Sequence, residues 1–225
     1  MMTKFLLITF TAMAVFYGCE SKKDVQPSSA DSTKTTAVLP KQQKTSILFL
    51  GTSLTAALGL DPSEGYPANI QKKIDSLKLP YECINGGVSG ETTSGLLSRL
   101  DWMLQGEIAV IVIESGANDG LRGTEVGTTR NNLIKIIEKC RLKYPNAKIL
   151  LAGMRVPPNM GPEYTKEFER IYPELSQQFS VPLVPFLLKN VGGIPELNQP
   201  DRIHPTAKGQ KIVAENVWQY LQPLL

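Results

Sequence analysis

The feature that most constrains the fold of this chain is a regular alternation between short apolar runs and segments with helical periodicity. Five mainly apolar runs stand apart in the sequence, at 47–50, 81–85, 109–113, 148–152 and 183–184. Runs of this length are typical of buried strands. Strands separated by helix-length segments require crossover connections, which favour a mostly parallel sheet covered by helices on both faces. The sequence therefore predicts an α/β fold, a three-layer α/β/α sandwich with a sheet of about five strands.

The segments between these runs carry apolar residues three and four positions apart. The stripes are Ile70, Ile74 and Leu77; Leu96, Leu97, Leu100 and Leu104; Leu133, Ile136, Ile137 and Cys140; Tyr164, Phe168, Ile171, Leu175 and Phe179; and Val213, Val217, Tyr220 and Leu221. Residues at this spacing share one face of a helix, so we expect the stripes to pack on the sheet as core. With no internal repeat in the sequence, residues 45–225 are predicted to form one domain.

Glycine-rich and polar segments follow four of the five predicted strands. They read GTSLT at 51–55, NGGVSGE at 85–91, ESGAND at 114–119 and, further past the fifth strand, DRIHP at 201–205. The functional crevice of an open parallel sheet lies beyond the carboxyl ends of its strands. We therefore expect the chemistry of the protein at this edge.

The chain has a single histidine, and its position suits a catalytic base. Acyl transfer by a serine needs a base to take the hydroxyl proton, an acid to orient that base, and donors for the developing oxyanion. His204 follows Asp201 by three residues, a spacing that within one turn can bring the carboxylate to the imidazole. Pro205 restricts His204 to extended backbone and can begin the last helix.

The segments GTSLT, SGET, GAND and DRIHP resemble, in order and approximate spacing, the four sequence blocks of the SGNH (GDSL-type) hydrolases. The resemblance covers residues 46–225. ESGANDGLRG, IYPEL and VPLVPF are also similar to stretches of the thioesterase I, lysophospholipase L1 and arylesterase branch. The resemblance implies a flavodoxin-like sandwich and a serine esterase or thioesterase that works through an acyl-enzyme, without a cofactor.

The same resemblance implies a role for each matching residue. Ser53 is the expected nucleophile, with His204 as base and Asp201 as the acid of the triad. The expected oxyanion hole consists of the backbone N–H groups of Ser53 and Gly90 and the side-chain amide of Asn118. Ser89 and Ser115 lie on the same predicted rim as rival nucleophiles, but they match positions that the family uses for loop structure.

The sequence departs from the family pattern at two positions. Thr52 stands where the GDSL block carries aspartate, and Ala117 stands where this branch often carries glycine. We expect Thr52 to hydrogen-bond the turn and alter its rigidity without loss of activity, and Ala117 to narrow the floor of the acyl site. Asp119 is expected to stabilise a turn, and Glu91 to cap a helix that begins near residue 92.

The first residues predict export. A lone Lys4 precedes an apolar run at 5–16, and Gly18 then stands directly before Cys19, as in a lipobox. We expect residues 1–18 to be a lipoprotein signal, Cys19 to be lipidated, and the polar residues 19–44 to form a flexible tether. A plain membrane anchor is the alternative. The predicted location is periplasmic or outer-membrane-associated.

Composition excludes several other classes of protein. Residues 45–225 hold 18 basic and 18 acidic side chains, which gives no electrostatic reason to expect a nucleic-acid partner. One histidine and no CxxC motif predict no metal site. Cys83 lies in a predicted strand and Cys140 on an apolar helix face, so we expect buried free thiols rather than a disulfide.

Two alternatives to a small-ester or thioester hydrolase remain open from the sequence. One is an SGNH carbohydrate esterase that removes acetyl groups, and the other is a non-catalytic surface lipoprotein with the same fold. A G-x-S-x-G elbow and a G-x-G-x-x-G fingerprint are both absent from the sequence, which disfavours an α/β-hydrolase and a dinucleotide enzyme. An exported enzyme would rarely meet cytosolic acyl-CoA, so lysophospholipids or other esters outside the cytoplasm are the expected substrates.

Overall fold

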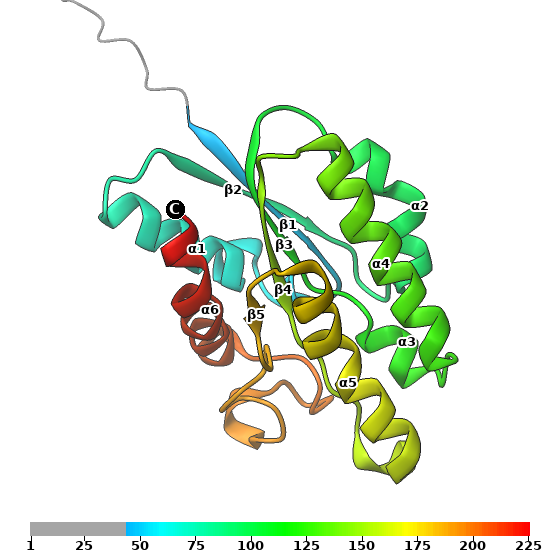
Figure 1. The fold of residues 1–225 in the computed structure, drawn as a ribbon. Helices are drawn as coiled ribbons and strands as arrows, with labels where there is room; N and C mark the ends of the chain where they lie inside the picture. Colours follow the sequence, from blue (N-terminus) through cyan, green and yellow to red (C-terminus); the bar gives the residue numbers. More distant parts are fainter. Residues whose placement is uncertain (1–43) are drawn as a thin grey trace, which may run out of the picture. The chain divides into compact units, whose positions relative to one another are not determined.

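A computed structural model describes residues 44–225, and its centre is one parallel sheet (Figure 1). The predicted signal, Cys19 and the tether up to residue 43 lie outside the described residues. The strand order is β2-β1-β3-β4-β5. The strands are β1 (Thr45–Gly51), β2 (Tyr81–Gly87), β3 (Ile108–Ile113), β4 (Lys148–Ala152) and β5 (Leu183–Val184). All pairs are parallel, so the predicted sheet of about five strands is confirmed.

Helices cover both faces of the sheet, as Figure 1 shows. One face carries α1 (Tyr66–Ser76) and α6 (Ala207–Leu221), which pack on each other. The other face carries α2 (Thr93–Met103), α3 (Ala117–Leu121), α4 (Val126–Lys143) and α5 (Pro162–Phe179). Short 3₁₀ turns occur at Pro62–Glu64, Pro158–Met160, Pro195–Leu197 and Gln222–Leu224. This is the predicted three-layer sandwich.

The core lies on both sides of the two central strands. Residues 47–50 of β1 and 110–113 of β3 are at most 1% exposed. The predicted helix stripes are buried in the core or pack against it, with one exception. Leu77 is 52% exposed because α1 ends at Ser76 and Leu77 lies beyond its last turn. Between residues 44 and 225, no helix combines the length and the apolarity that a membrane crossing requires.

The two cysteines of the described region are free thiols. Cys140 is fully buried on α4, as predicted, whereas Cys83 is only partly buried because β2 is an edge strand. Burial raises the pKa of each thiol to about 12. Both cysteines therefore stay protonated at neutral pH and are poor nucleophiles.

The register of the central strands brings three strand ends to one level. Gly51 at the end of β1 pairs with Gly87 at the end of β2, and Leu50 pairs with Ile113 at the end of β3. The segments that follow these strands therefore leave the sheet side by side at its carboxyl edge. Two of the helices beyond this edge begin with a threonine cap, Thr92 before α2 and Thr206 before α6.

Candidate active site

Ser53 lies in a tight turn immediately after β1. The Ala56 N–H donates to the Thr52 carbonyl at 2.9 Å, and the Leu58 N–H donates to the Ser53 carbonyl at 3.0 Å. Only glycine fits at position 51, because a Cβ there would lie 1.9 Å from Thr55 Oγ1. The turn leaves Ser53 8% exposed at the carboxyl edge of the sheet.

His204 and Asp201 complete a chain of hydrogen bonds to Ser53. The Nε2 atom of His204 lies 2.9 Å from Ser53 Oγ, and its Nδ1 atom lies 2.6 Å from Asp201 Oδ2. The other oxygen of Asp201 accepts the backbone N–H groups of Ile203 and His204, at 2.9 and 3.0 Å. These bonds lower the pKa of Asp201 to about 2, the His204 backbone N–H having the largest effect. A carboxylate that is ionised at neutral pH fixes the imidazole with its proton on Nδ1, so that Nε2 accepts the serine proton.

Each of the three expected oxyanion donors keeps a hydrogen without an acceptor among residues 44–225. Among the hydrogen bonds of residues 44–225, the backbone N–H groups of Ser53 and Gly90 have no acceptor. The Asn118 amide donates one hydrogen to the Glu91 carbonyl at 2.9 Å, which leaves its second hydrogen for a ligand. Gly90 has φ of 77°, a conformation that glycine adopts without strain.

A cleft of about 590 Å³ opens beside Ser53. Ser53, Asn118 and His204 line it, whereas Gly90 and Asp201 lie outside its lining. Most of its wall is apolar: Leu54, Ala117, Leu121, Met154, Val156, Pro157, Pro158, Phe186, Leu188 and Ile203. Arg155 and Arg202 also border the cleft, and the guanidinium of Arg155 lies 4.8 Å from the ring centre of Phe186.

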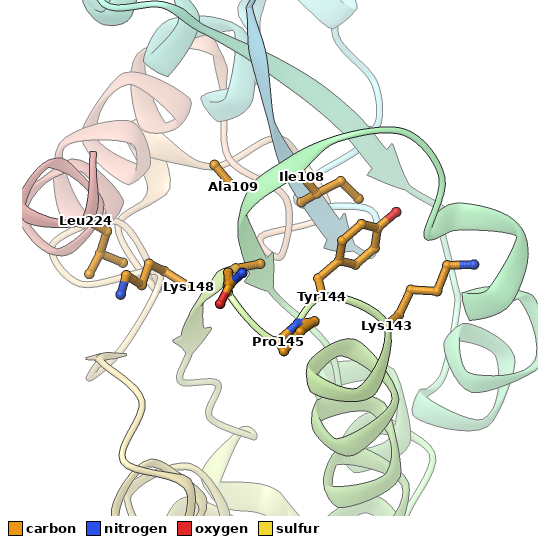
Figure 2. Close-up of a pocket in the computed structure, with 9 residues that line it drawn as sticks. Ile108, Ala109, Lys143, Tyr144, Pro145, Lys148 and Leu224 are labelled. Carbon is orange, nitrogen blue, oxygen red and sulfur yellow. The ribbon is translucent and has the colours of Figure 1, made fainter.

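A second hollow, of about 410 Å³, lies at the opposite edge of the sheet, where β3 and β4 begin (Figure 2). Ile108, Lys143, Tyr144 and Lys148 are among its lining residues. The Tyr144 hydroxyl donates to the Gly106 carbonyl at 3.0 Å. None of the candidate site residues lines this hollow, so it is separate from the chemistry at the carboxyl edge.

The rival serines lack the partner that activates a hydroxyl. Ser115 is 1% exposed, and its Oγ has no hydrogen-bond partner among the described residues. Ser89 is exposed and makes no side-chain hydrogen bond within residues 44–225. Because the only imidazole of the chain bonds Ser53, the geometry selects Ser53 over both.

Comparison with known proteins shows the family of the chain. The model of the GDSL-like lipase/acylhydrolase family matches residues 49–212. The chain belongs to this family. It is 43% identical over 180 residues to the esterase TesA of Pseudomonas aeruginosa, covering 80% of this chain and 89% of that protein. It is 36% identical over 180 residues to the thioesterase 1/protease 1/lysophospholipase L1 of Escherichia coli K12, covering 80% and 84%.

Solved structures of GDSL-like hydrolases share the fold. A crystal structure of TesA superposes with a TM-score of 0.76 at 42% identity, covering 80% of this chain and 99% of that chain. The esterase EstA from Pseudoalteromonas, inhibited by monoethylphosphonate, gives 0.75 at 35% identity, covering 80% and 98%. The predicted enzyme class, an acyl hydrolase of the esterase and thioesterase type, is confirmed. A family 3 carbohydrate esterase of Clostridium thermocellum, at 20% identity and a TM-score of 0.67, shares the fold alone.

Thr52, which replaces the aspartate of the GDSL block, is 1% exposed and hydrogen-bonds a buried carboxylate at the end of β3. Its N–H and its hydroxyl both donate to Glu114, at 2.8 and 2.9 Å. The sequence predicted a hydrogen bond from Thr52 to its own turn, but its partner, Glu114, comes directly after β3. Glu114 was not predicted as a site residue, although its place directly after a buried strand was visible in the sequence.

Glu91 does not cap α2, which corrects the expectation from sequence. Thr92 is the N-cap and accepts the Gly95 N–H at 3.3 Å, while the Glu91 carboxylate accepts two hydrogen bonds of 2.6 Å from Arg99. Arg99 also donates to the Gly86 carbonyl at 2.7 Å. Arg99, the seventh residue of α2, offers Glu91 a charged partner that donates two hydrogen bonds to its carboxylate.

The loop that carries Gly90 is thus held from three sides. Arg99 bonds its beginning and end, Arg122 donates to the Gly90 carbonyl at 2.8 Å, and the Val88 N–H donates to the Gly51 carbonyl at 2.9 Å. Arg122 therefore belongs to the framework of this loop. Asp119, expected in a turn, instead accepts the Thr93 N–H and hydroxyl at 2.8 and 2.6 Å across to α2.

Proposed function

We propose that the protein hydrolyses carboxylic esters or thioesters of apolar acyl groups, with Ser53 as nucleophile, His204 as base and Asp201 as the acid that orients it. The observation that carries the proposal is the unbroken chain of bonds from Asp201 through His204 to Ser53 Oγ, with lengths of 2.6 and 2.9 Å. A serine hydroxyl at neutral pH needs such a base to attack a carbonyl.

The reaction follows from the positions of the hydrogens. His204 Nε2 takes the Ser53 proton while Oγ attacks the acyl carbon, and Asp201 stabilises the imidazolium that forms. Collapse of the tetrahedral intermediate breaks the bond to the leaving group, which takes the proton from His204. Water, activated by the same imidazole, then releases the acid and restores the serine.

The oxyanion is stabilised by donors that are free to receive it. The backbone N–H groups of Ser53 and Gly90, and one hydrogen of the Asn118 amide, have no acceptor among residues 44–225. The loop of Gly90 is fixed by Arg99 and Arg122, so the donor need not reorganise during the reaction.

The cleft supports an apolar acyl group over an acetylated sugar. Its walls are mainly aliphatic and aromatic, with few side chains able to recognise several sugar hydroxyls. Arg155 and Arg202 at its border suit an anionic group on the leaving side, such as the phosphate of a lysophospholipid.

The proposal also includes the location and the domain organisation of the protein. Residues 1–18 would direct export, Cys19 would carry a lipid anchor, and residues 45–225 would form the catalytic domain.

The test is labelling with a fluorophosphonate, followed by a substrate panel. Wild-type protein is expected to be labelled and Ser53→Ala is not. Esters and thioesters of short and medium acyl chains, a lysophospholipid and an acetylated sugar would then be compared by kcat/KM. If the wild type neither reacts with the probe nor hydrolyses any substrate of the panel, the proposal is refuted and a non-catalytic module is favoured. A clear preference for the acetylated sugar would refute the substrate class.

A further inference from the structure

Glu114 is a buried carboxylate that the proposed reaction does not use. It follows β3 directly and is 0% exposed. Its Oε2 accepts the Thr52 N–H and the Thr55 hydroxyl, each at 2.8 Å, and its Oε1 accepts the Thr52 hydroxyl at 2.9 Å. These two threonines flank Ser53, one residue before it and two residues after it.

Two further polar groups of the nucleophile turn, the Thr55 hydroxyl and the Leu54 carbonyl, contact buried side chains. The Thr55 hydroxyl lies 2.7 Å from the Tyr66 hydroxyl at the start of α1. Gln210 of α6 donates to the Leu54 carbonyl at 3.2 Å and accepts the Tyr66 N–H at 2.9 Å. The turn is therefore held by Glu114 after β3, by Tyr66 of α1 and by Gln210 of α6. The Ser53 hydroxyl is bonded to His204.

We propose that Glu114 is a positioning residue for the nucleophile, which fixes the Ser53 hydroxyl against His204 by accepting hydrogen bonds from Thr52 and Thr55. The inference rests on the proposed function, because it concerns the same serine. Glu114 itself touches no substrate. Misplacement of a nucleophile by about 1 Å can cost on the order of a hundredfold in rate, so a residue of this kind affects turnover without contacting the cleft.

The hydrogen bonds suit an ionised carboxylate. Two hydroxyls and one backbone N–H point at Glu114, and an ionised carboxylate only accepts. A protonated carboxyl would have to donate, and the nearest acceptors are the same threonine hydroxyls. Protonation of Glu114 therefore reverses at least one bond of the turn.

This ionisation falls in the neutral range. Burial raises the pKa of Glu114 to about 7, although the hydrogen bonds of Thr52 and Thr55 oppose that rise. The titratable groups that face it are the phenols of Tyr66 on α1 and Tyr172 on α5. Burial raises the pKa of both phenols well above the usual value, so both stay neutral while Glu114 titrates.

Thr52 fits this arrangement better than a second acid. A threonine donates a hydroxyl to Glu114 without adding a negative charge within hydrogen-bond distance, whereas two carboxylates so close could not both ionise. The departure from the GDSL block thus leaves Glu114 as the one carboxylate beneath the turn within the described residues. Thr52→Val keeps the shape and removes this bond, and Thr52→Ser keeps the bond.

The experiment compares Glu114→Gln, Thr52→Val and Thr52→Ser with the wild type in the full chain. The readouts are kcat and KM for a short-chain aryl ester, the rate of fluorophosphonate labelling, and the pH profile of kcat, each per molecule of folded protein. We expect Glu114→Gln and Thr52→Val to lower kcat and the labelling rate at least about tenfold with little change in KM, and Thr52→Ser to stay near the wild type. Glu114→Gln should also lose one ionisation near neutral pH.

Labelling of both Glu114→Gln and Thr52→Val at the wild-type rate, with an unaltered pH profile, would overturn the inference. Loss of folded protein without a change in rate per folded molecule would also overturn it, because Glu114 would then be purely structural. If Glu114→Gln does not fold, the comparison of kcat and labelling rate between Thr52→Val and Thr52→Ser decides. A wild type that the probe does not label refutes the proposed function itself, which separates the two failures.

Discussion

The imidazole of His204 lies 2.9 Å from the hydroxyl of Ser53, although 151 positions of sequence separate the two residues. Ser53 follows the first strand, and His204 precedes the last helix. The Asp201–Arg202–Ile203 turn makes the contact possible because Arg202 adopts φ of 61°, which bends the chain so that the Asp201 carboxylate accepts both following N–H groups and the imidazole.

The first prediction concerns the choice of nucleophile. Ser53→Ala should abolish fluorophosphonate labelling and reduce kcat by several orders of magnitude, whereas Ser89→Ala should leave both within about twofold. Ser89 is the matched control because it lies on the same edge but has no base. Labelling that survives in Ser53→Ala and disappears in Ser89→Ala would contradict the assignment.

Replacement of Asn118 should produce a slow enzyme, not an inactive one. Asn118→Ala removes one oxyanion donor, which in other hydrolases costs on the order of a hundredfold to a thousandfold in kcat. KM should change little, because the donor acts mainly on the charge that develops in the transition state. Steady-state kinetics on a medium-chain ester measure this, and a rise in KM at constant kcat would argue against the role.

Breaking the ion pair between Glu91 and Arg99 should destabilise the protein and the oxyanion loop together. Their side chains are 8% and 19% exposed, so Glu91→Gln leaves a poorly hydrated guanidinium and should cost about 3 kcal/mol in the free energy of unfolding. Lys139→Met breaks the exposed pair with Asp101 and should cost less than about 1 kcal/mol. Urea unfolding measures the change in the free energy of unfolding for both variants. Equal changes would contradict the larger contribution predicted for the buried pair.

The stability of the protein should depend on pH through Glu114. Because its pKa rises from 4.5 to about 7 on folding, the folded state favours the protonated form. The wild type should therefore lose on the order of 3 kcal/mol relative to Glu114→Gln as pH rises from below 4.5 to above 7. Asp201→Asn provides a control of opposite sign, because the Asp201 pKa falls to about 2 and its contribution is lost only in acid, below about pH 4. A constant difference between wild type and Glu114→Gln across this range would contradict the prediction.

The acyl-chain preference should respond to Ala117, which lines the cleft beside Asn118. Ala117→Leu should reduce kcat/KM for medium-chain esters more than for acetate esters, since the longer side chain fills the space that the acyl group needs. Ala117→Gly should shift the preference in the opposite direction. Ratios of kcat/KM across a chain-length series test this, and ratios that do not change would place the acyl group elsewhere.

Much of the fold and of the candidate site could be predicted from the sequence, because both depend on local patterns. The five strands follow from short apolar runs, and Asp201 and His204 make their contact within one turn. Ser53 was distinguishable from Ser89 and Ser115 by its place in the GTSLT block. The family supplied the rest of that pattern, including Asn118.

What could not be predicted depends on neighbours that are distant in sequence. Glu91 was expected to cap α2 because acidic side chains favour helix N-termini. Arg99 comes within reach of Glu91 only when α2 has formed, and Thr92 then caps the helix instead. The partners of Glu114 are Thr55 and Thr52, 59 and 62 positions away in the sequence. They come close because β1 pairs with β3, and hydrophobic periodicity does not show which strands pair. The exposure of Cys83 depends on the order of the strands, which the sequence leaves open.

The distance in sequence between Ser53 and His204 also affects the order in which activity can appear during synthesis. A ribosome that has completed the first 200 residues has made the proposed nucleophile and oxyanion loops but not the proposed base. His204 leads, within three residues, into α6, which packs against α1. A chain that lacks residues 201–204 is therefore expected to be inert, and the proposed hydrolysis can begin only after this segment has folded.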